Sequence, residues 1–427
     1  MLKTYIKTLA RTIAKRNVVL RKIMRYIMNR YRIIRYSIRT KGIRSDEYTI
    51  LFTAFNGKSY TCTPKAVYEY MISSGKYSDY KFIWVVRDME KYEFLTHNPN
   101  TTIVKNRTKE YEQALASAKY WICNYRIYDY IYPKKDQVYV QCWHGTPLKR
   151  LGYDIQHSDN AMNSQQEIRE KYRTDAEKFS YILSPSAFAS EKFASAWNLN
   201  ETGQTDKIVE VGYPRDDFMY NFTQDDVIRI KQNLNIPHDK KVLLYAPTWR
   251  DNQHSADLGY IYTNSVDFGK LRKKLEDEWI ILFRAHYLVA NSFDFEKYAG
   301  FVYDVSSYDD INELYIVSDM LITDYSSVFF DFANLKRPIL YYMYDLEYYK
   351  DELRGFYIDL SELPGPIVEK EDELVSSIQK LDKEFVYDEK YQRFNKKFNY
   401  LNDGHASRRL IERVLKSSAK SIDRIIE

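Results

Sequence analysis

Short apolar runs alternate with helical stretches from Tyr48 onward, and this alternation constrains the fold more than any other feature of the chain. Strands and helices in turn are typical of parallel sheets covered by helices. The first half predicts seven strands, at Thr49–Thr53, Lys81–Val86, Thr102–Val104, Tyr120–Cys123, Gln137–Cys142, Tyr181–Leu183 and Ile208–Val211. It also predicts helices, at Lys65–Ser73, Lys109–Ala118 and Ser186–Trp197.

A turn after Val211 interrupts the alternation, and a helix over Asp225–Leu234 precedes its restart. The second half predicts five strands, at Val242–Ala246, Trp279–Arg284, Phe301–Asp304, Met320–Thr323 and Ile339–Tyr342, and a last helix from near His405. The 427 residues are enough for two cores. We therefore predict an α/β fold of two doubly wound, Rossmann-type domains facing a cleft. The predicted division is an arm (1–45), a first domain (46–211), a linker (212–236), a second domain (237–402) and a C-terminal helix (403–427).

The arm carries the positive charge of the chain. Residues 1–45 hold fourteen Lys or Arg and no acid, and without them the remaining chain has 50 basic and 59 acidic residues. No Gly or Pro interrupts residues 1–40, and apolar positions from Leu20 through Ile23, Ile27, Tyr31 and Ile34 share one face. A basic amphipathic helix of this kind is typical of a monotopic membrane anchor. The alternatives are a helix packed on the body through its apolar stripe and an RNA-binding arm.

Composition and residue spacing argue against a membrane span, a signal sequence, a nucleic-acid partner and a metal site. No run of 18 apolar residues is present, so a spanning helix is not predicted, and charges interrupt every candidate signal sequence. Cys62, Cys123 and Cys142 are far apart and odd in number, which favours a reducing, cytoplasmic location. The mildly acidic body argues against a nucleic-acid partner. His157, His238, His254 and His405 lack the spacing of metal ligands, so no metal is predicted.

Polar residues follow the predicted strands where open α/β sheets bind their ligands. Gln137–Cys142 leads into Trp143, His144, Gly145, Thr146 and Pro147. In the second half, the residues that follow strands are Pro247 and Thr248, then Arg284, Ala285 and His286, then Ser326, Ser327 and Asp331. A serine pair at a helix start offers hydroxyl and N–H groups to an anion. Together these residues predict a phosphate-rich ligand on the second domain with His144 facing it.

Each of these signals has a plainer interpretation. His144 can cap a strand edge, Ser326 and Ser327 can form an ordinary N-cap, and Arg284 can belong to a strand-end ion pair. Asp331 can face solvent. Neither a GxGxxG nor a Walker loop is present, so a dinucleotide oxidoreductase and a P-loop nucleotidase are not supported.

Five motifs in a fixed order resemble one known family. They are WHGTPLK from Trp143, GYPR from Gly212, APTWR from Ala246, RAH from Arg284 and TDYSS from Thr323. The chain resembles the CDP-glycerol:poly(glycerophosphate) glycerophosphotransferases, the teichoic acid primases and polymerases, from about Gln137 to Tyr357. One departure is Tyr287, where the family often has proline after the second histidine.

The resemblance implies a GT-B-like fold, attachment to the inner membrane face and no cofactor. It implies transfer of glycerol phosphate from CDP-glycerol to the hydroxyl of a lipid-linked polyol-phosphate or disaccharide acceptor, with release of CMP. By position it makes His144 the base and His286 a phosphate ligand. It assigns CDP-glycerol contacts to Trp143, His144, Gly145, Thr146, Pro147, Arg215, Pro247, Thr248, Arg284, Ala285, His286, Ser326, Ser327 and Asp331.

A neutral histidine can accept the proton of an attacking alcohol, and fixed cations stabilise the departing phosphate. The same motifs leave three alternatives open: a CDP-ribitol donor, a sugar-nucleotide glycosyltransferase and a non-catalytic membrane-surface protein. They do not separate primase from polymerase, and they do not predict an oligomeric state.

Overall fold

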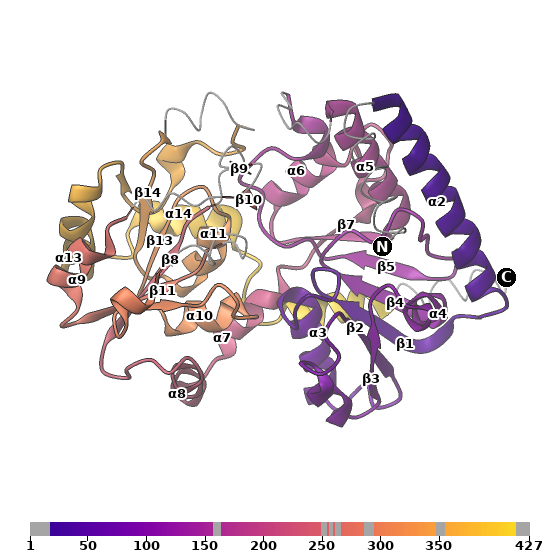
Figure 1. Ribbon diagram of the computed structural model, residues 1–427, viewed down its shortest axis with the longest axis horizontal. Coiled ribbons are helices and arrows are strands. Elements are labelled where there is room, and N and C mark those ends of the chain that lie inside the picture. Colours follow the sequence, from indigo (N-terminus) through magenta and orange to yellow (C-terminus); the bar gives the residue numbers. More distant parts are fainter. Residues whose placement is uncertain are drawn as a thin grey trace, which may run out of the picture.

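A computed structural model describes residues 18–156, 164–248, 254–255, 259–260, 266–285, 294–346 and 355–415. Figure 1 shows two lobes, each built on a parallel sheet with helices around it. The described residues do not include residues 1–17 of the arm, nor Trp249, Arg250, His286 and Tyr287.

The first sheet has seven parallel strands in the order β3-β2-β1-β4-β5-β6-β7. They are β1 (Asp46–Thr53), β2 (Lys81–Val86), β3 (Thr101–Lys105), β4 (Ala118–Cys123), β5 (Val138–Gln141), β6 (Tyr181–Ser184) and β7 (Ile208–Glu210). The helices of this lobe are α2 (Val18–Thr40), α3 (Cys62–Ser73), α4 (Lys109–Ser117), α5 (Gln165–Lys178) and α6 (Ala187–Ala196). All seven predicted strands are present, whereas α5 was not predicted.

The second sheet has six parallel strands in the order β12-β11-β8-β13-β14-β15. They are β8 (Lys241–Ala246), β11 (Trp279–Phe283), β12 (Val302–Asp304), β13 (Met320–Thr323), β14 (Ile339–Tyr342) and β15 (Ile367–Val368). The helices are α7 (Phe218–Asn221), α8 (Gln224–Asn233), α9 (Phe268–Leu275), α10 (Ile311–Val317), α11 (Val328–Phe332), α13 (Leu374–Glu384) and α14 (Glu389–Phe398). β9 (His254–Ser255) and β10 (Gly259–Tyr260) form a separate antiparallel pair. The five strands predicted here are confirmed, and β15 is additional.

Both sheets are covered on both faces, which explains their nearly continuous apolar strands. In β1, Ile50 and Phe52 enter one core while Leu51 enters the core on the opposite face. In β8, Leu243 and Leu244 divide in the same way. Because successive side chains of a strand point to opposite faces, two cores per sheet require this apolar pattern.

The end of the chain returns to the first sheet. A helix from residue 406, described to residue 415, places Leu410, Ile411 and Val414 in the core beside β1 and β4. Before it, the side-chain oxygen of Asn402 accepts a hydrogen bond of 3.1 Å from the backbone N–H of Tyr213. The two lobes are therefore joined twice, by the segment after β7 and by this returning segment.

Helix α2 is attached to the first lobe by charge and by Ile33 and Tyr36, which pack against its core. Arg35 and Arg39 donate to the carboxylate of Glu112 on α4, at 2.7 and 2.9 Å, and Glu112 is fully buried. The predicted apolar stripe points away from the body, with Ile27 60% exposed and Tyr31 60% exposed. Packing of α2 on the body through that stripe is therefore wrong. None of the described helices is long and apolar enough to cross a membrane.

Candidate functional site

The loop after β5 places a histidine at the centre of the first sheet's carboxyl edge. Trp143 adopts a left-handed backbone (φ 50°), which is uncommon for a residue with a side chain. Its N–H donates to the side-chain oxygen of Gln141 at 3.0 Å, and its ring packs edge-on against Trp197 with centroids 4.8 Å apart. This strained turn directs the chain away from the strand and sets the position of His144.

One ring nitrogen of His144 is held by the backbone. Nδ1 lies 3.1 Å from the carbonyl oxygen of Asn124, the residue that follows β4. Because a carbonyl can only accept, Nδ1 carries the hydrogen and Nε2 keeps its lone pair in the neutral ring. The aromatic rings of Phe55, Tyr125 and Trp143 surround the imidazole, with centroids 5.8, 6.3 and 4.3 Å away.

The pKa of His144 is lowered to about 4, mainly by burial. The bond to the Asn124 carbonyl acts in the opposite direction, and the positive charge of Arg215 lowers the pKa further. The imidazole is therefore neutral at physiological pH, with Nε2 able to accept a proton.

The two lobes touch next to this histidine. A Cβ atom added to Gly145 would lie 3.4 Å from Cβ of Ser327, an ordinary contact, and 2.7 Å from its Oγ, which is closer than real Cβ atoms approach. A larger residue therefore requires the Ser327 hydroxyl or the loop to move, and the close approach shows that the loop after β5 packs directly on the turn after β13. Gly145, the residue after His144, therefore contacts one of the two predicted serines, and a ligand held between His144 and the serines stays a prediction.

Ser327 occupies the N-cap position of α11, but its side chain makes no capping hydrogen bond. The plain N-cap interpretation therefore does not account for its hydroxyl. Beside it, one oxygen of Asp324 accepts from the backbone N–H groups of Thr248 and Tyr325, both at 2.7 Å, and from the Thr248 hydroxyl. Asp324 thereby ties the end of β8 to the end of β13 and shapes this side of the site.

Arg215 and Asp331 form a buried ion pair, with Nη2 of the arginine 2.7 Å from Oδ1 of the aspartate. They are 4% and 6% exposed, so the interpretation of Asp331 as a solvent-facing residue is wrong. The guanidinium also contacts Asp216 through Nε at 3.4 Å and the Cys62 sulfur through Nη1 at 3.9 Å. Residues from the linker, α3 and α11 meet at this one cation.

Burial raises the pKa of Asp331 and that of Asp216, and the Arg215 charge opposes the rise in both. Burial alone would lower the pKa of Arg215, but the two carboxyl groups outweigh it and the pKa is raised. One permanent cation is thus shared between two carboxyl groups.

Arg284 lies at the end of β11 and is fixed by carbonyl groups instead of a carboxylate. Its Nη1 donates to the carbonyl oxygens of Val305 and Tyr308, at 3.0 and 2.8 Å. Burial lowers the pKa of its guanidinium. The strand-end ion pair proposed for Arg284 does not occur among the described residues, and Ala285 beside it is buried.

Thr146 and Pro147 complete the loop after β5, both buried, and Pro247 is partly exposed after β8. Asn124 and Asp324 were missed as individual site residues. Both directly follow a predicted strand, so the rule that selected His144 would have selected them too. Among the described residues, no group of three or more His, Cys, Asp or Glu is arranged to hold a metal ion.

Comparison with known proteins gives a consistent result. Residues 35–416 match the model of the CDP-Glycerol:Poly(glycerophosphate) glycerophosphotransferase family. A teichoic acid poly(glycerol phosphate) polymerase of Bacillus spizizenii is 38% identical over 372 residues, which cover 87% of this chain and 92% of the relative. The corresponding polymerase of Bacillus subtilis is 41% identical over 372 residues, covering 86% of this chain but 49% of the relative.

The solved structure of the wall teichoic acid polymerase TagF, in a variant soaked with CDPG, superposes with a TM-score of 0.82. It is 34% identical and the match covers 97% of this chain and 99% of that one. A UDP-GlcNAc 2-epimerase from Neisseria meningitidis, 13% identical with a TM-score of 0.51, shares the fold alone. The predicted two-domain, GT-B-like fold is therefore confirmed, and the chain belongs to the CDP-Glycerol:Poly(glycerophosphate) glycerophosphotransferase family.

Proposed function

We propose that this protein transfers glycerol phosphate from CDP-glycerol to a hydroxyl group of a membrane-linked acceptor and releases CMP. The observation that supports the proposal is the contact between Gly145 and Ser327, because Gly145 follows the neutral His144 of one lobe and Ser327 belongs to the serine turn of the other. Its relatives of known name are polymerases and transferases of teichoic acid, and one was solved with CDPG.

The reaction begins with the acceptor hydroxyl, whose oxygen attacks the phosphorus that bears the glycerol. His144 accepts the hydroxyl proton through Nε2, since Nδ1 is held by the Asn124 carbonyl. The three surrounding rings limit the motion of the imidazole. A positioned base of this kind accelerates such transfers by about 10²–10⁴-fold.

Negative charge then develops on the departing CMP phosphate, and the second lobe supplies the groups that stabilise it. Ser326 and Ser327 present hydroxyl groups at the turn after β13, and Arg284 holds a positive charge at the end of β11. His286 follows Arg284 by two residues and remains the predicted phosphate ligand. Stabilisation of developing charge by fixed donors is the main contribution in phosphoryl transfer.

Arg215 and Asp331 contribute through their buried pair. The pair joins the linker to α11, and the Arg215 charge adds to burial, which is the main cause, in lowering the pKa of the nearby imidazole. We propose that the pair orders the donor side of the site. Contact of either side chain with CDP-glycerol itself stays a prediction.

The alternative donor is CDP-ribitol. A teichoic acid poly(ribitol-phosphate) polymerase is 31% identical over 306 residues, covering 68% of this chain. The phosphate-binding groups described above do not measure the length of the polyol. The geometry favours neither donor, but the higher identities belong to glycerol phosphate enzymes.

The test is incubation of the purified protein with each CDP-polyol and a lipid-linked acceptor, with CMP release and product mass measured. We expect transfer from CDP-glycerol, and a product mass that distinguishes one added unit from many. Transfer from no CDP-polyol would contradict the enzymatic proposal. His144→Ala should abolish turnover while CDP binding persists, and near wild-type turnover would contradict the role of His144 as base.

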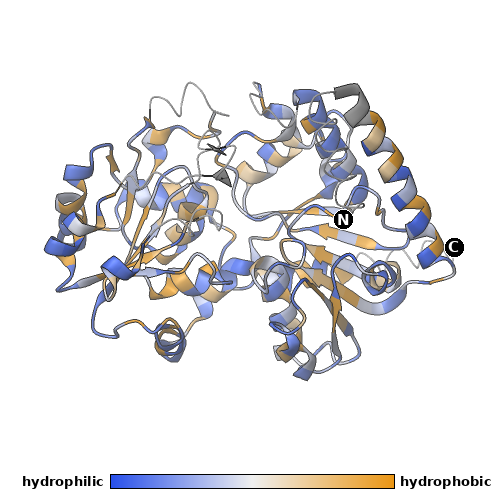
Figure 2. Ribbon diagram, in the orientation of Figure 1, coloured by the Kyte–Doolittle hydropathy of each residue, from blue (hydrophilic) through white to orange (hydrophobic). Residues whose placement is uncertain are grey.

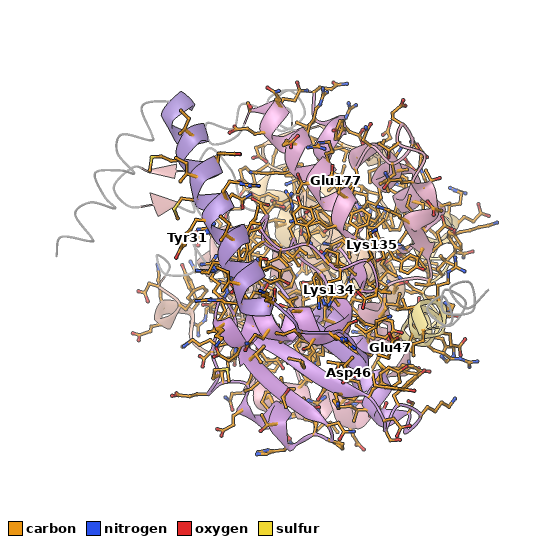
Figure 3. The ribbon with its side chains drawn as sticks, turned by 90° about the vertical axis from the view of Figure 1, so that its right-hand side faces the viewer. Tyr31, Asp46, Glu47, Lys134, Lys135 and Glu177 are labelled. Carbon is orange, nitrogen blue, oxygen red and sulfur yellow. The ribbon has the colours of Figure 1, made fainter. Side chains whose placement is uncertain are left out.

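We further propose peripheral attachment to the cytoplasmic face of the membrane through α2. Figure 2 shows hydrophobic and hydrophilic residues alternating along this helix. In Figure 3 α2 runs along one side of the molecule and Tyr31 projects from it, while Lys134 and Lys135 lie on the same side together with the acids Asp46, Glu47 and Glu177. An exposed apolar stripe on a helix whose charged residues are all basic suits an interface of anionic lipids.

Since Arg35 and Arg39 attach α2 to the body, deleting the arm would also expose Glu112. Substitutions on the outer face are therefore the sharper test. Ile27→Asp combined with Ile34→Asp should reduce sedimentation with phosphatidylglycerol vesicles, while activity on a soluble acceptor is kept. Unchanged sedimentation would contradict attachment through α2.

A further inference from the structure

The loop between β1 and α3 lies next to His144 on the first lobe. Strand β4 separates β1 from β5, and neighbouring strands are about 4.8 Å apart. The His144 ring meets Phe55 of this loop edge-on, and the side-chain oxygen of Asn124 accepts from the Phe55 N–H at 2.8 Å. The loop therefore borders the histidine. The start of α3 lies at the junction of the two lobes, where the Cys62 sulfur is 3.9 Å from Arg215 and Lys65 donates to Asp310 of the second lobe at 2.6 Å.

Polar atoms without partners gather at this edge. Nδ2 of Asn124 has no hydrogen-bond partner and the residue is fully buried; its amide is directed to the loop by the bond to Phe55. Oγ1 of Thr63, in the first turn of α3, is likewise buried and unpartnered. Thr53 at the end of β1 and Thr146 after His144 share this property. Unpaired buried donors destabilise a protein unless a ligand satisfies them.

The start of α3 is prepared for an anion. The helix has twelve residues and no acidic side chain in its first turn, and its N-cap residue Thr61 makes no side-chain capping bond. Helix α4 of the same sheet differs, because Thr108 caps it and two glutamates occupy its first turn. The positive end of α3 is thus not neutralised by the protein.

We propose that the start of α3 and the Asn124 amide form a subsite for the phosphodiester that precedes the attacking hydroxyl of the acceptor. The inference rests on the proposed function. In a chain of glycerol phosphates, this phosphate is separated from the terminal hydroxyl by the three carbons of one glycerol. The subsite belongs to the first lobe, whereas Ser327 and Arg284 belong to the second, so the acceptor and donor phosphates are held by different lobes. It explains how the enzyme selects an acceptor that already ends in a polyol phosphate.

Thr61→Asp tests this subsite. Aspartate is a good N-cap, and the change places a carboxylate where the phosphate would bind. Because Thr61 is 4% exposed, the buried charge lowers stability, and Thr61→Asn, a neutral cap of the same shape, controls for the change of shape. Thr108→Asp is the matched control, the same change at the cap of α4. Thermal unfolding should show both variants folded, and both should keep the wild-type KM for CDP-glycerol.

The probes are octyl glycerophosphate, a phosphodiester with a terminal glycerol, and octyl glycerol ether, which lacks the phosphate. We expect wild type and Thr108→Asp to prefer the phosphodiester, and Thr61→Asp to raise its KM by ten- to a hundredfold without changing the KM of the ether. Equal KM values for the phosphodiester in Thr61→Asp and wild type would overturn the proposal. A raised KM for CDP-glycerol instead would assign the start of α3 to the donor and overturn it as well.

Calorimetric binding of octyl glycerophosphate without donor separates this inference from the proposed function. Weaker binding by Thr61→Asp than by Thr108→Asp supports the subsite even if no CDP-polyol is a substrate. Equal binding by the two variants contradicts the subsite even if CDP-glycerol is a substrate.

Discussion

Gly145→Ala is the change that tests most directly whether the two lobes form one site. The added Cβ would lie 2.7 Å from Ser327 Oγ, about 1 Å short of an ordinary contact. Either the Ser327 hydroxyl rotates away or the loop that carries His144 shifts. Loss of one hydroxyl bond to a charged phosphate costs about 1.5–3 kcal/mol, and a 1 Å displacement of a reacting group costs about 10²-fold in rate. We therefore expect kcat/KM for CDP-glycerol to fall by about ten- to a hundredfold.

The assay is initial-rate CMP release, with thermal unfolding to show that the variant is folded. Ser327→Ala supplies the second corner of a double-mutant cycle, because it removes Oγ and leaves Cβ at 3.4 Å. If rotation of the hydroxyl relieves the clash, Gly145→Ala should add less than about threefold in the Ser327→Ala background. Activity of Gly145→Ala within twofold of wild type, or fully multiplicative losses, would refute the contact as a functional one.

Three further predictions concern charge. Protonated His144 cannot act as a base, and its pKa is lowered to about 4. We therefore expect kcat/KM to stay level down to about pH 5 and to fall below that pH. A fall centred near pH 6.5 would contradict a pKa lowered by burial. Glu112→Gln weakens the bonds that Arg35 and Arg39 of α2 make to this side chain, and it should lower the free energy of unfolding in urea by about 1–3 kcal/mol. The control Glu167→Gln, at an ion pair with a largely exposed arginine, should cost under about 1 kcal/mol. Equal effects would contradict attachment through Glu112. Asp331→Asn leaves the Arg215 cation with one carboxyl partner and should lower the free energy of unfolding by about 3–5 kcal/mol. It should also weaken CDP binding measured by calorimetry. Wild-type stability would contradict a structural ion pair.

The strands were predictable because parallel sheets covered on both faces need unbroken apolar runs. β8 and β13 each read as such a run, and each is followed by polar residues. The same rule located His144, Arg284 and Ser327, since parallel strands bring their carboxyl ends to one edge. Helix α5 was missed because its residues are mostly charged, and it is defined by a capping box between Ser164 and Glu167.

The orientation of the arm shows where a local pattern was insufficient. The stripe of Ile27 and Tyr31 predicts an amphipathic helix, but it leaves open whether the body or a membrane covers it. Glu112, more than seventy residues away in sequence, shows that the body does not cover the stripe, because its carboxylate binds Arg35 and leaves the stripe facing outward.

The sequence by itself determined the strands and the family to which the chain belongs, and it predicted which residues carry the chemistry. Only the tertiary structure decided how they combine: that Gly145 fits against Ser327, that the Asn124 carbonyl selects the tautomer of His144, and that Asp331 is buried with Arg215. The physical reason is that periodicity reports each element's own burial pattern. Contacts between residues on different elements depend on how neighbouring strands align within a lobe, as for Asn124 and His144, and on how the two packed lobes meet.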